Sequence, residues 1–384
     1  MIFSFLSYLA LPFAIFYLLI KGRWKEVGKR LGLGIKKNKK KILFHCASVG
    51  EITAATPLLE KLENIFVTTM SLTGLERAKK YDCALLPFDI PFIMVNFLKK
   101  IEPSLIILME TEIWPNLVLT AKRAKIPIII VNGRLTEKSF NPFKRYHIFF
   151  KPIFEYIDFV GTQSEKDKAR FKELGFKQVE NLGNLKFTVN YPKYNAAYER
   201  KRIGISDDDF VIVFGCLREG EEIILANIYK KLKDKIKNLK LIIVPRHLNW
   251  IKKLQKSFAK SKLLSKDKNS EIIIVDKMGE LSKMYAISNL SIVGGSFVNY
   301  KGHNPIEAVF YEKPTIIGNY HSSCYEVVKK LKNGILVSNK KKLLSDILNL
   351  YKDRDLQKNM VEISQKVLSE NRNSKYKKLI DSYL

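Results

Sequence analysis

The sequence predicts two doubly wound α/β domains preceded by a membrane helix, and three features of the 384-residue chain support this. Short apolar runs rich in β-branched residues alternate with longer helical patterns, which is typical of parallel sheets. The length exceeds one ordinary core and suits two domains of roughly 150 to 200 residues. An uncharged apolar stretch, residues 2–20, precedes both domains.

The first domain is predicted over residues 23–190, as a Rossmann-like α/β unit. Its expected strands are 41–49, 65–70, 84–86, 105–109, 127–131 and, closing the sheet, 159–161. The helices expected between them are 51–62, 75–80, 92–100 and 116–124. Residues 191–207 are polar and lack a strong period, so we expect a linker there.

A second Rossmann-like domain is predicted over residues 208–384. Its expected strands are 210–214, 240–244, 271–275, 290–293, 315–317 and 334–337. Helical patterns separate these runs, so a second parallel sheet is indicated. The prediction leaves open whether the last helix packs back on the N-terminal domain.

Residues 1–22 are predicted to be a membrane anchor, because a helix over 2–20 nearly matches the ~30 Å hydrocarbon core of a bilayer. No basic residue precedes the run, which disfavours a cleaved signal peptide. The open alternative is an amphipathic or buried surface helix, since Pro12 interrupts the run. Ten basic residues follow and place the remaining chain on the cytoplasmic side: Lys21, Arg23, Lys25, Lys29, Arg30, Lys36, Lys37, Lys39, Lys40 and Lys41.

The formal net charge of +29 suggests either nucleic acid or an anionic membrane as a partner. No helix-turn-helix, zinc-finger or RNP-like motif supports nucleic acid. A polybasic stretch beside an apolar anchor favours lipid headgroups, at about 1 kcal/mol per basic side chain. The cysteines have no C-x-x-C spacing, so we expect reduced thiols and neither disulfides nor a metal site: Cys46, Cys83, Cys216 and Cys324.

A glycine-rich loop follows the predicted strand 290–293 and resembles a nucleotide-phosphate site. Pro305 suits the first position of the next helix, whose free amides would then face an anion. Glu307, one turn inside, would accept hydrogen bonds from ribose hydroxyls. The open alternative is simple turn and capping chemistry. The candidate ligands are Gly294, Gly295, Ser296, His303, Asn304 and Glu307.

Two other strand ends in the second domain carry polar residues and are expected at the same edge of the sheet. Arg246 and His247 end one strand, and the arginine can clamp a phosphate with two hydrogen bonds. Another strand is followed by Met278, Gly279 and Glu280. Together with the glycine-rich loop, these residues predict a donor-binding edge.

In the first domain, Ser48, Gly50 and Glu51 follow the first predicted strand, where open α/β sheets bind ligands. Glu51 is our candidate general base. The open alternative is that Ser48 caps the helix and Glu51 is a favourable charge in its first turn. Glu112 follows another strand and is a second catalytic candidate, unless it pairs with surface lysines.

These segments, in order and over essentially the whole chain, resemble the Kdo transferase family of lipopolysaccharide biosynthesis. The matching motifs are S-V-G-E at 48–51, E-T-E-I-W-P-N at 110–116, G-N-L-K-F at 183–187, R-E-G-E-E at 218–222, P-R-H at 245–247, M-G-E-L at 278–281 and G-G-S-F…G-H-N-P-I-E-A at 294–308. Two departures concern the donor contacts: Cys216-Leu217 replaces the usual Ser-Thr, and Asn299-Tyr300-Lys301 fills a loop that is often glycine-rich.

The resemblance implies a GT-B glycosyltransferase with two Rossmann-like domains facing a cleft. It implies inverting transfer of 3-deoxy-D-manno-octulosonic acid (Kdo) from CMP-Kdo to a lipid A precursor, lipid IVA, at the cytoplasmic face of the inner membrane. Ser48, Gly50 and Lys186 would contact the acceptor, and no metal or other cofactor is expected. The alternatives are a GT-B enzyme that uses a UDP-sugar and a membrane-tethered nucleic-acid-binding protein. Oligomeric state stays open.

Overall fold

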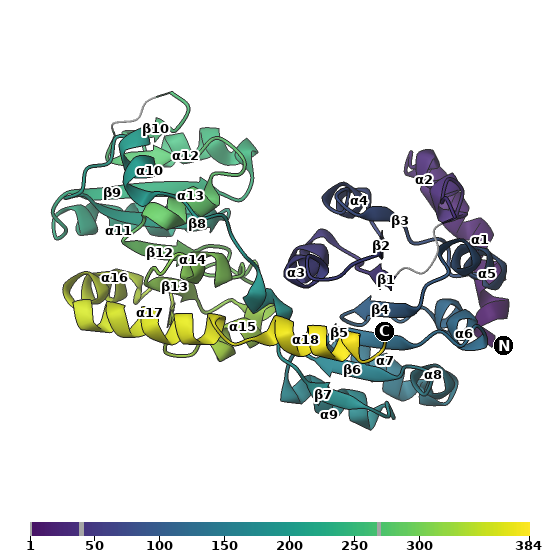
Figure 1. Ribbon diagram of the computed structural model, residues 1–384. Helices are drawn as coiled ribbons and strands as arrows, with labels where there is room; N and C mark the ends of the chain where they lie inside the picture. Colours follow the sequence, from purple (N-terminus) through teal and green to yellow (C-terminus); the bar gives the residue numbers. More distant parts are fainter. Residues whose placement is uncertain (1, 38–41, 267–269) are drawn as a thin grey trace. The chain divides into compact units, whose positions relative to one another are not determined.

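The computed structural model describes residues 2–37, 42–266 and 270–384 (Figure 1). The chain divides into two compact units. Unit 1 comprises Met1–Val189 and Asn371–Leu384, and unit 2 comprises Asn190–Glu370. Each unit contains one parallel sheet of seven strands.

The sheet of unit 1 has the strand order β3-β2-β1-β4-β5-β6-β7. Its strands are β1 (Ile42–His45), β2 (Ile65–Thr69), β3 (Asp82–Leu85), β4 (Leu105–Met109), β5 (Ile128–Gly133), β6 (Phe159–Thr162) and β7 (Val179–Asn181). The order reverses between β1 and β4, which pair directly. In doubly wound sheets, ligands bind outside the carboxyl ends of the strands at this reversal.

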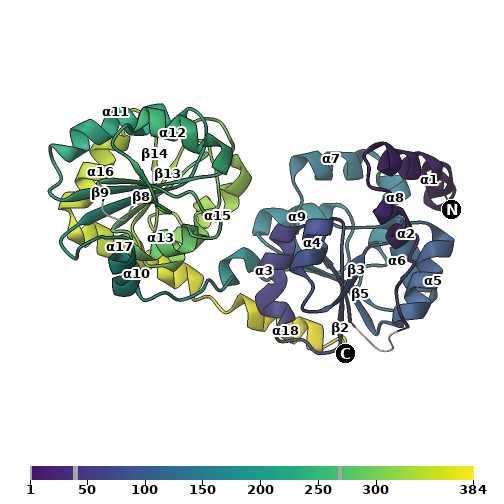
Figure 2. The ribbon, with the colours of Figure 1, turned by 90° about the horizontal axis from the view of Figure 1, so that it is seen from above.

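Several helices of unit 1 begin directly after a serine or threonine that caps them. Ser48, Ser71, Thr136 and Ser164 each cap a helix by accepting a backbone N–H bond. The helices are α1 (Ile2–Ile20), α2 (Trp24–Arg30), α3 (Val49–Leu59), α4 (Leu72–Arg77), α5 (Pro91–Ile101), α6 (Pro115–Arg123), α7 (Glu137–Arg145), α8 (His147–Phe154), α9 (Glu165–Glu173), the 3₁₀ turn η1 (Leu185–Thr188) and α18 (Arg372–Asp381). The last of these, α18, packs against α3 and η1 (Figure 2).

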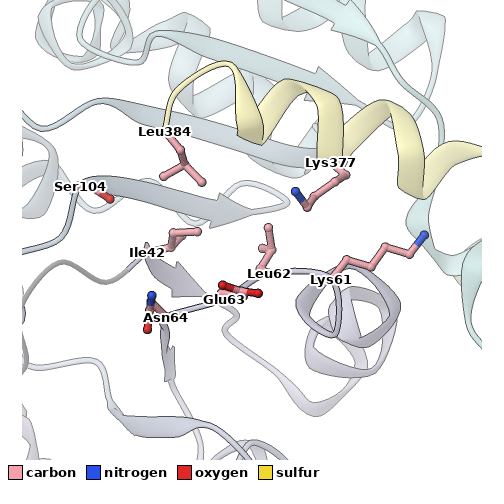
Figure 3. A pocket seen from close by; sticks show the side chains of 8 residues that line it. All are labelled: Ile42, Lys61, Leu62, Glu63, Asn64, Ser104, Lys377 and Leu384. Carbon is pink, nitrogen blue, oxygen red and sulfur yellow. The ribbon is translucent and has the colours of Figure 1, made fainter.

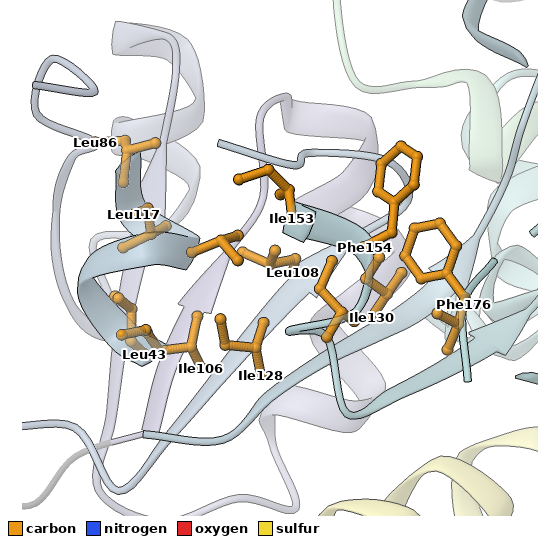
Figure 4. Packing of buried hydrophobic residues seen from close by; sticks show 14 of the residues in the cluster. Leu43, Leu86, Ile106, Leu108, Leu117, Ile128, Ile130, Ile153, Phe154 and Phe176 are labelled. Atoms are coloured by element: carbon orange, nitrogen blue, oxygen red, sulfur yellow. The ribbon is translucent and has the colours of Figure 1, made fainter. Parts of the chain in front are cut away.

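The central strands of unit 1 are apolar on both faces because helices cover both. Leu43, Ile106 and Ile130 contribute to one buried cluster, shown in Figure 4. Their neighbours Phe44 and Ile107 contribute to the opposite cluster. This period of two is the side-chain alternation of a strand, and it explains why the strands read as continuous apolar runs.

The sheet of unit 2 has the order β10-β11-β9-β8-β12-β13-β14, with its reversal between β8 and β12. Its strands are β8 (Phe210–Leu217), β9 (Leu239–Pro245), β10 (Lys262–Leu263), β11 (Ile272–Ile274), β12 (Leu290–Val293), β13 (Thr315–Gly318) and β14 (Leu336–Ser338). The helices are α10 (Ala196–Arg202), α11 (Glu221–Lys233), η2 (Leu248–Trp250), α12 (Ile251–Ser257), α13 (Leu281–Ile287), α14 (Ile306–Phe310), η3 (Ser322–Cys324), α15 (Tyr325–Lys330), α16 (Leu343–Lys352) and α17 (Arg354–Leu368).

The structure differs from the sequence prediction at the edges of both sheets and in the predicted linker. The first sheet does not close at 159–161, because β7 pairs with β6 beyond it. The short edge strand β10 was not predicted. The predicted linker 191–207 contains α10, which the guanidinium of Arg200 joins to unit 2 by a 3.0 Å bond to the carbonyl of Ile287. Lys39, Lys40 and Lys41 lie outside the described residues.

Candidate active site

Glu51 lies in the first turn of α3, immediately after β1. One of its carboxylate oxygens accepts the backbone N–H of Ala47 at 2.8 Å, and the other accepts the Ser48 hydroxyl at 2.9 Å. The Ser48 Oγ in turn accepts the backbone N–H of Glu51 at 3.3 Å. Ser48 is therefore the helix cap, as the alternative interpretation of the sequence had it, and the same bonds hold the Glu51 carboxylate in place.

Burial, and secondarily the negative charge of Glu110, raise the pKa of Glu51 to about 7. Glu112 adds a smaller contribution in the same direction, while the bonds from Ala47 and Ser48 oppose it. We refer to Glu51, Glu110 and Glu112 as the carboxylate cluster. A carboxylate with a pKa near neutrality can accept a proton and still be ionised at the working pH, as general-base catalysis requires.

The other two carboxylates of the cluster follow β4, which pairs with β1. Glu110 lies 3.3 Å from the ammonium of Lys186, and Glu112 lies 3.7 Å from Nε2 of His45. The indole N–H of Trp114 also points to this ring nitrogen, at 3.3 Å. Because an indole N–H only donates, Nε2 of His45 accepts, and Nδ1 carries the proton toward Thr68 Oγ1 at 3.0 Å.

The predicted acceptor residues therefore lie at the same edge of the sheet in unit 1. Ser48 and Gly50 are exposed beside Glu51. An added Cβ at Gly50 would have Ser48 Oγ as its nearest contact, at 3.9 Å. The surface of the first turn of α3 is thus open beside Gly50.

In unit 2, a buried carboxylate organises the glycine-rich loop after β12. Glu221, which is fully buried, accepts the backbone N–H groups of Gly295 at 2.8 Å, Ser296 at 3.0 Å and Phe297 at 2.9 Å. It also accepts the backbone N–H of Arg218 at 2.9 Å. The backbone N–H groups of Gly295, Ser296 and Phe297 are therefore bound internally and are not free for a ligand.

Glycine is required in this loop for close packing. A Cβ on Gly294 would lie 2.7 Å from the carbonyl oxygen of Cys216 and 2.9 Å from Oε2 of Glu221. Ser296 is fully buried, and its hydroxyl bonds the Val293 carbonyl and the Gly318 N–H. Gly294 and Ser296 therefore hold the loop after β12 tightly against the sheet of unit 2.

Four basic side chains gather above this loop. Arg218 lies over the ring of Tyr300, 4.8 Å from its centroid, and donates to Nε2 of His247 at 2.7 Å. Burial and the positive charge of Arg246, followed by those of Arg218 and His247, lower the pKa of His303 to about 4. Nε2 of His303 is buried and has no hydrogen-bond partner among the described residues. An anion is the ligand that such a group of charges favours.

The helix after the glycine-rich loop differs from its predicted form. α14 has five residues, and Pro305 is its N-cap rather than its first helical residue. Asn304 Oδ1 accepts the Ile306 N–H at 3.1 Å, so this helix amide is not free to face an anion. The anion site predicted at this helix terminus loses that amide and stays a prediction for the rest of the first turn. Glu307 accepts the hydroxyl of Ser282 and is largely buried.

The turn after β11 is only partly available to a ligand. Glu280 binds Arg202 of α10 at 2.7 Å and Lys283 at 2.9 Å, so its carboxylate is already paired. Met278 is 70% exposed, and Gly279 has a φ of 83°, which suits glycine. Glu280 therefore holds α10 against this turn, while Met278 and Gly279 stay open to solvent.

Two pockets of unit 1 lie away from these residues. The first, of about 320 Å³, is lined by side chains at the amino ends of β1 and β2 (Figure 3). The second, of about 450 Å³, lies near the start of β5 and is lined partly by Lys122, Lys125 and Lys177. Both contain residues at the edge opposite the carboxylate cluster, so neither is part of the candidate site.

Sequence reasoning missed several residues that organise the site. Glu110 and Glu221 stood inside quoted motifs, but only the fold shows what each carboxylate binds. Arg218 stood beside Glu221 and was also passed over. Their shared signal was a charged side chain between an apolar strand and the start of the next helix: Glu110 and Arg218 directly follow β4 and β8, and Glu221 begins α11.

Comparison with known proteins covers both units. The family model of 3-deoxy-D-manno-octulosonic-acid transferase matches residues 25–189, and that of glycosyl transferases group 1 matches residues 198–367. A Kdo transferase of Haemophilus influenzae is 33% identical over 315 residues, covering 76% of this chain and 73% of that protein. The Aquifex aeolicus Kdo transferase is 30% identical, covering 86% of this chain and 92% of that protein.

A bifunctional glycosyltransferase/methyltransferase of Fusobacterium nucleatum is 34% identical, and the chain spans 56% of its length. Two solved structures share the fold at low identity. A glycosyltransferase from Rickettsia africae has a TM-score of 0.60 at 15% identity, covering 90% of this chain and 99% of that chain. Anabaena HepE in complex with UDP has a TM-score of 0.61 at 14% identity, covering 89% and 100%.

Two Rossmann-like units with polar side chains at their switch points define a glycosyltransferase of the GT-B fold, as predicted. The family model that matches the first unit and the relatives that match most of the chain narrow this class further. The chain belongs to the Kdo transferase family, which transfers Kdo in lipopolysaccharide biosynthesis.

Proposed function

We propose that the protein transfers Kdo from CMP-Kdo to a lipid A precursor, with inversion at the anomeric carbon and Glu51 as the general base. The observation that carries the proposal is the exposed first turn of α3, where a fixed carboxylate has a pKa of about 7. In this reaction the acceptor hydroxyl loses its proton to Glu51 while its oxygen forms the bond to the anomeric carbon. The bond from that carbon to the phosphate oxygen breaks, and CMP leaves with the electron pair.

The donor half of the proposal rests on the basic group of unit 2. CMP-Kdo carries a phosphate and a sugar carboxylate on one carbon, so its reacting centre is doubly anionic. Arg246 and Arg218 would meet these charges and stabilise the phosphate as the anomeric bond breaks. Glu307, oriented by Ser282, would accept from the ribose. The scheme uses no metal, and activity that a chelator abolishes would count against it.

Replacing Arg246 with alanine should raise the KM for CMP-Kdo by about 10- to 100-fold, since a hydrogen bond to a charged group contributes about 1.5–3 kcal/mol. Arg246→Lys should retain part of this affinity, because lysine keeps the positive charge but cannot form the bidentate hydrogen bond of a guanidinium to a phosphate. Steady-state kinetics with CMP-Kdo generated in place measures both.

Lys256→Ala, an exposed position on α12, serves as the control. Inhibition by CMP but not by UDP is expected for the wild type. An unchanged KM for CMP-Kdo in Arg246→Ala would show that Arg246 does not bind the donor. Stronger inhibition by UDP than by CMP would favour a UDP-sugar as the donor.

We further propose that α1 attaches the enzyme to the inner membrane, on the cytoplasmic side. The helix is continuous through Pro12 and apolar enough to cross a bilayer. Its first turns pack on the rest of unit 1, since Ser4 donates to Asn116 at 2.7 Å and the ring centroids of Phe3 and Phe150 lie 4.9 Å apart. Most of its other large side chains are exposed, including Phe13 at 75%, whereas Leu18 is buried. The neighbouring helix α8 adds exposed apolar side chains, Ile148 and Phe149.

Replacing Phe13 and Phe16 together with serine should weaken binding to anionic phospholipid vesicles by tenfold or more, because each side chain loses about 1.5–3 kcal/mol of burial. Neither residue makes the contacts that hold α1 on unit 1, so the fold should persist. Vesicle co-sedimentation measures the binding. Activity on detergent-dispersed acceptor should stay near the wild-type value, and Tyr198→Ser, an exposed aromatic of unit 2, is the control. Equal losses on vesicles and in detergent would show that α1 is structural.

A further inference from the structure

Tyr376, from the C-terminal helix α18, lies fully buried beneath the carboxyl edge of the unit 1 sheet. Its hydroxyl accepts the backbone N–H of Asn132 at 3.2 Å. The hydroxyl hydrogen faces the Gly183 carbonyl at 2.9 Å, with the carbonyls of Gly161 and Thr162 at 3.1 and 3.4 Å. One side chain thus joins the ends of β5 and β6 to the segment before η1.

Asn132 continues this connection toward the site. It is fully buried with a φ of 56°, a conformation uncommon for residues other than glycine. Its side-chain oxygen accepts the N–H of Leu185 at 2.9 Å, and its carbonyl accepts the Gln163 amide at 3.0 Å. The Gln163 oxygen in turn accepts the amide of Asn184 at 2.9 Å.

These bonds set the position of Lys186. The Asn184 side chain accepts the backbone N–H of Lys186 at 2.8 Å, within the turn that Asn132 and Gln163 hold. The Lys186 ammonium then lies 3.3 Å from Glu110, and the Gln163 amide lies 3.4 Å from the same oxygen. A continuous path of polar contacts therefore runs from the buried Tyr376 to the half-buried Lys186 and Glu110.

We propose that Tyr376 is a positioning residue for the reaction: through Asn132 and residues 183–186 it keeps Lys186 beside Glu110. This inference rests on the proposed role of Glu51. Buried hydrogen bonds of this kind favour one arrangement of the groups that they join, although Nδ2 of Asn132 has no hydrogen-bond partner among the described residues. The residue lies far from the cluster in sequence, in the segment that follows unit 2.

The consequence for Glu51 follows from charge. The negative charge of Glu110 disfavours ionisation of Glu51. The ammonium of Lys186 beside Glu110 offsets part of that charge. If Lys186 moves away, Glu51 holds its proton up to a higher pH. The charged or titratable groups around Glu51, by element, are His45 at the end of β1 and Cys46 after it, Glu110 and Glu112 after β4, and Lys186 in η1.

Tyr376→Phe tests the inference, because it removes only the hydroxyl. We expect the acidic limb of the pH–rate profile to move upward by roughly half a pH unit or more, so that kcat at a pH below the limb falls about threefold or more. The KM for CMP-Kdo should not change. Tyr383→Phe is the matched control, since its hydroxyl has no hydrogen bond among the described contacts and the wild-type profile should persist. Circular dichroism and thermal melting monitor the fold of each variant.

A lower kcat with an unmoved acidic limb, or equal effects of the two variants, would overturn the inference and leave Tyr376 with a purely structural role. If Tyr376→Phe does not fold, Gln163→Met interrupts the same path and should move the limb in the same direction; an unmoved limb there also overturns it. A wild-type profile without an acidic limb would instead remove the role of Glu51, which separates the two failures.

Discussion

Glu51→Gln is expected to lower kcat for Kdo transfer by about 10²- to 10⁴-fold, the usual effect of removing a general base. The glutamine oxygen can still accept the Ala47 N–H, and its amide can donate to Ser48 Oγ, so both local bonds survive in altered form. The neutral amide also removes a buried charge from the neighbourhood of Glu110 and Glu112. The variant should therefore be no less stable than the wild type while lacking the proton acceptor.

Glu60→Gln is the matched control for this substitution. Glu60 is the C-cap residue of the same helix, and its exposed side chain pairs with Lys80. Exposed pairs of this kind contribute about 0–1 kcal/mol, so neither stability nor kcat should change appreciably. Near-normal turnover of Glu51→Gln would refute the general-base role.

The largest expected loss of stability follows from Glu221→Ala. The fully buried carboxylate accepts four backbone N–H groups, and without it those amides lose their partner. A buried unsatisfied polar group costs about 1–3 kcal/mol, so we expect a total loss of about 3–5 kcal/mol. For a domain of this size that corresponds to a Tm lower by roughly 10 °C. Calorimetry measures this shift, and CMP affinity should fall with it.

Glu221→Gln should be nearly as disruptive, because its amide nitrogen would face N–H donors. Glu219→Ala is the control two residues away, since that side chain is exposed and pairs with Lys253. It should change stability by no more than about 0.5 kcal/mol. A Tm of Glu221→Ala within about 2 °C of the wild type would show that the loop does not depend on this carboxylate.

The parts of the fold that the sequence predicts well are the central strands. β4 and β12 have the predicted bounds, because strands buried on both faces require continuous apolar runs. The edge strands β7 and β10 have only three and two residues, too few for a period to be recognised. The return of α18 to unit 1 depends on the packing of Tyr376, which no local pattern encodes.

The sequence predicts those parts of the candidate site whose interacting residues are close together in the chain. Ser48 and Glu51 are three residues apart, so their capping bond follows from helix geometry alone. The binding of Glu221 to the Gly295 loop joins residues 74 positions apart, and that of Glu110 to Lys186 also depends on the fold. For that reason the sequence marked the glycine loop as a ligand site, whereas its amides are bound internally.

The central claim is that the ionised Glu51 carboxylate takes the acceptor proton during Kdo transfer. Its most direct test is the pH dependence of kcat/KM for the wild-type enzyme, which reports the pKa of the free enzyme's essential base. The account predicts a rate that is half-maximal near pH 7, levels off above about pH 8 and falls about tenfold per pH unit below about pH 6, since only the ionised carboxylate accepts a proton. A rate unchanged between about pH 5 and 8 would contradict it.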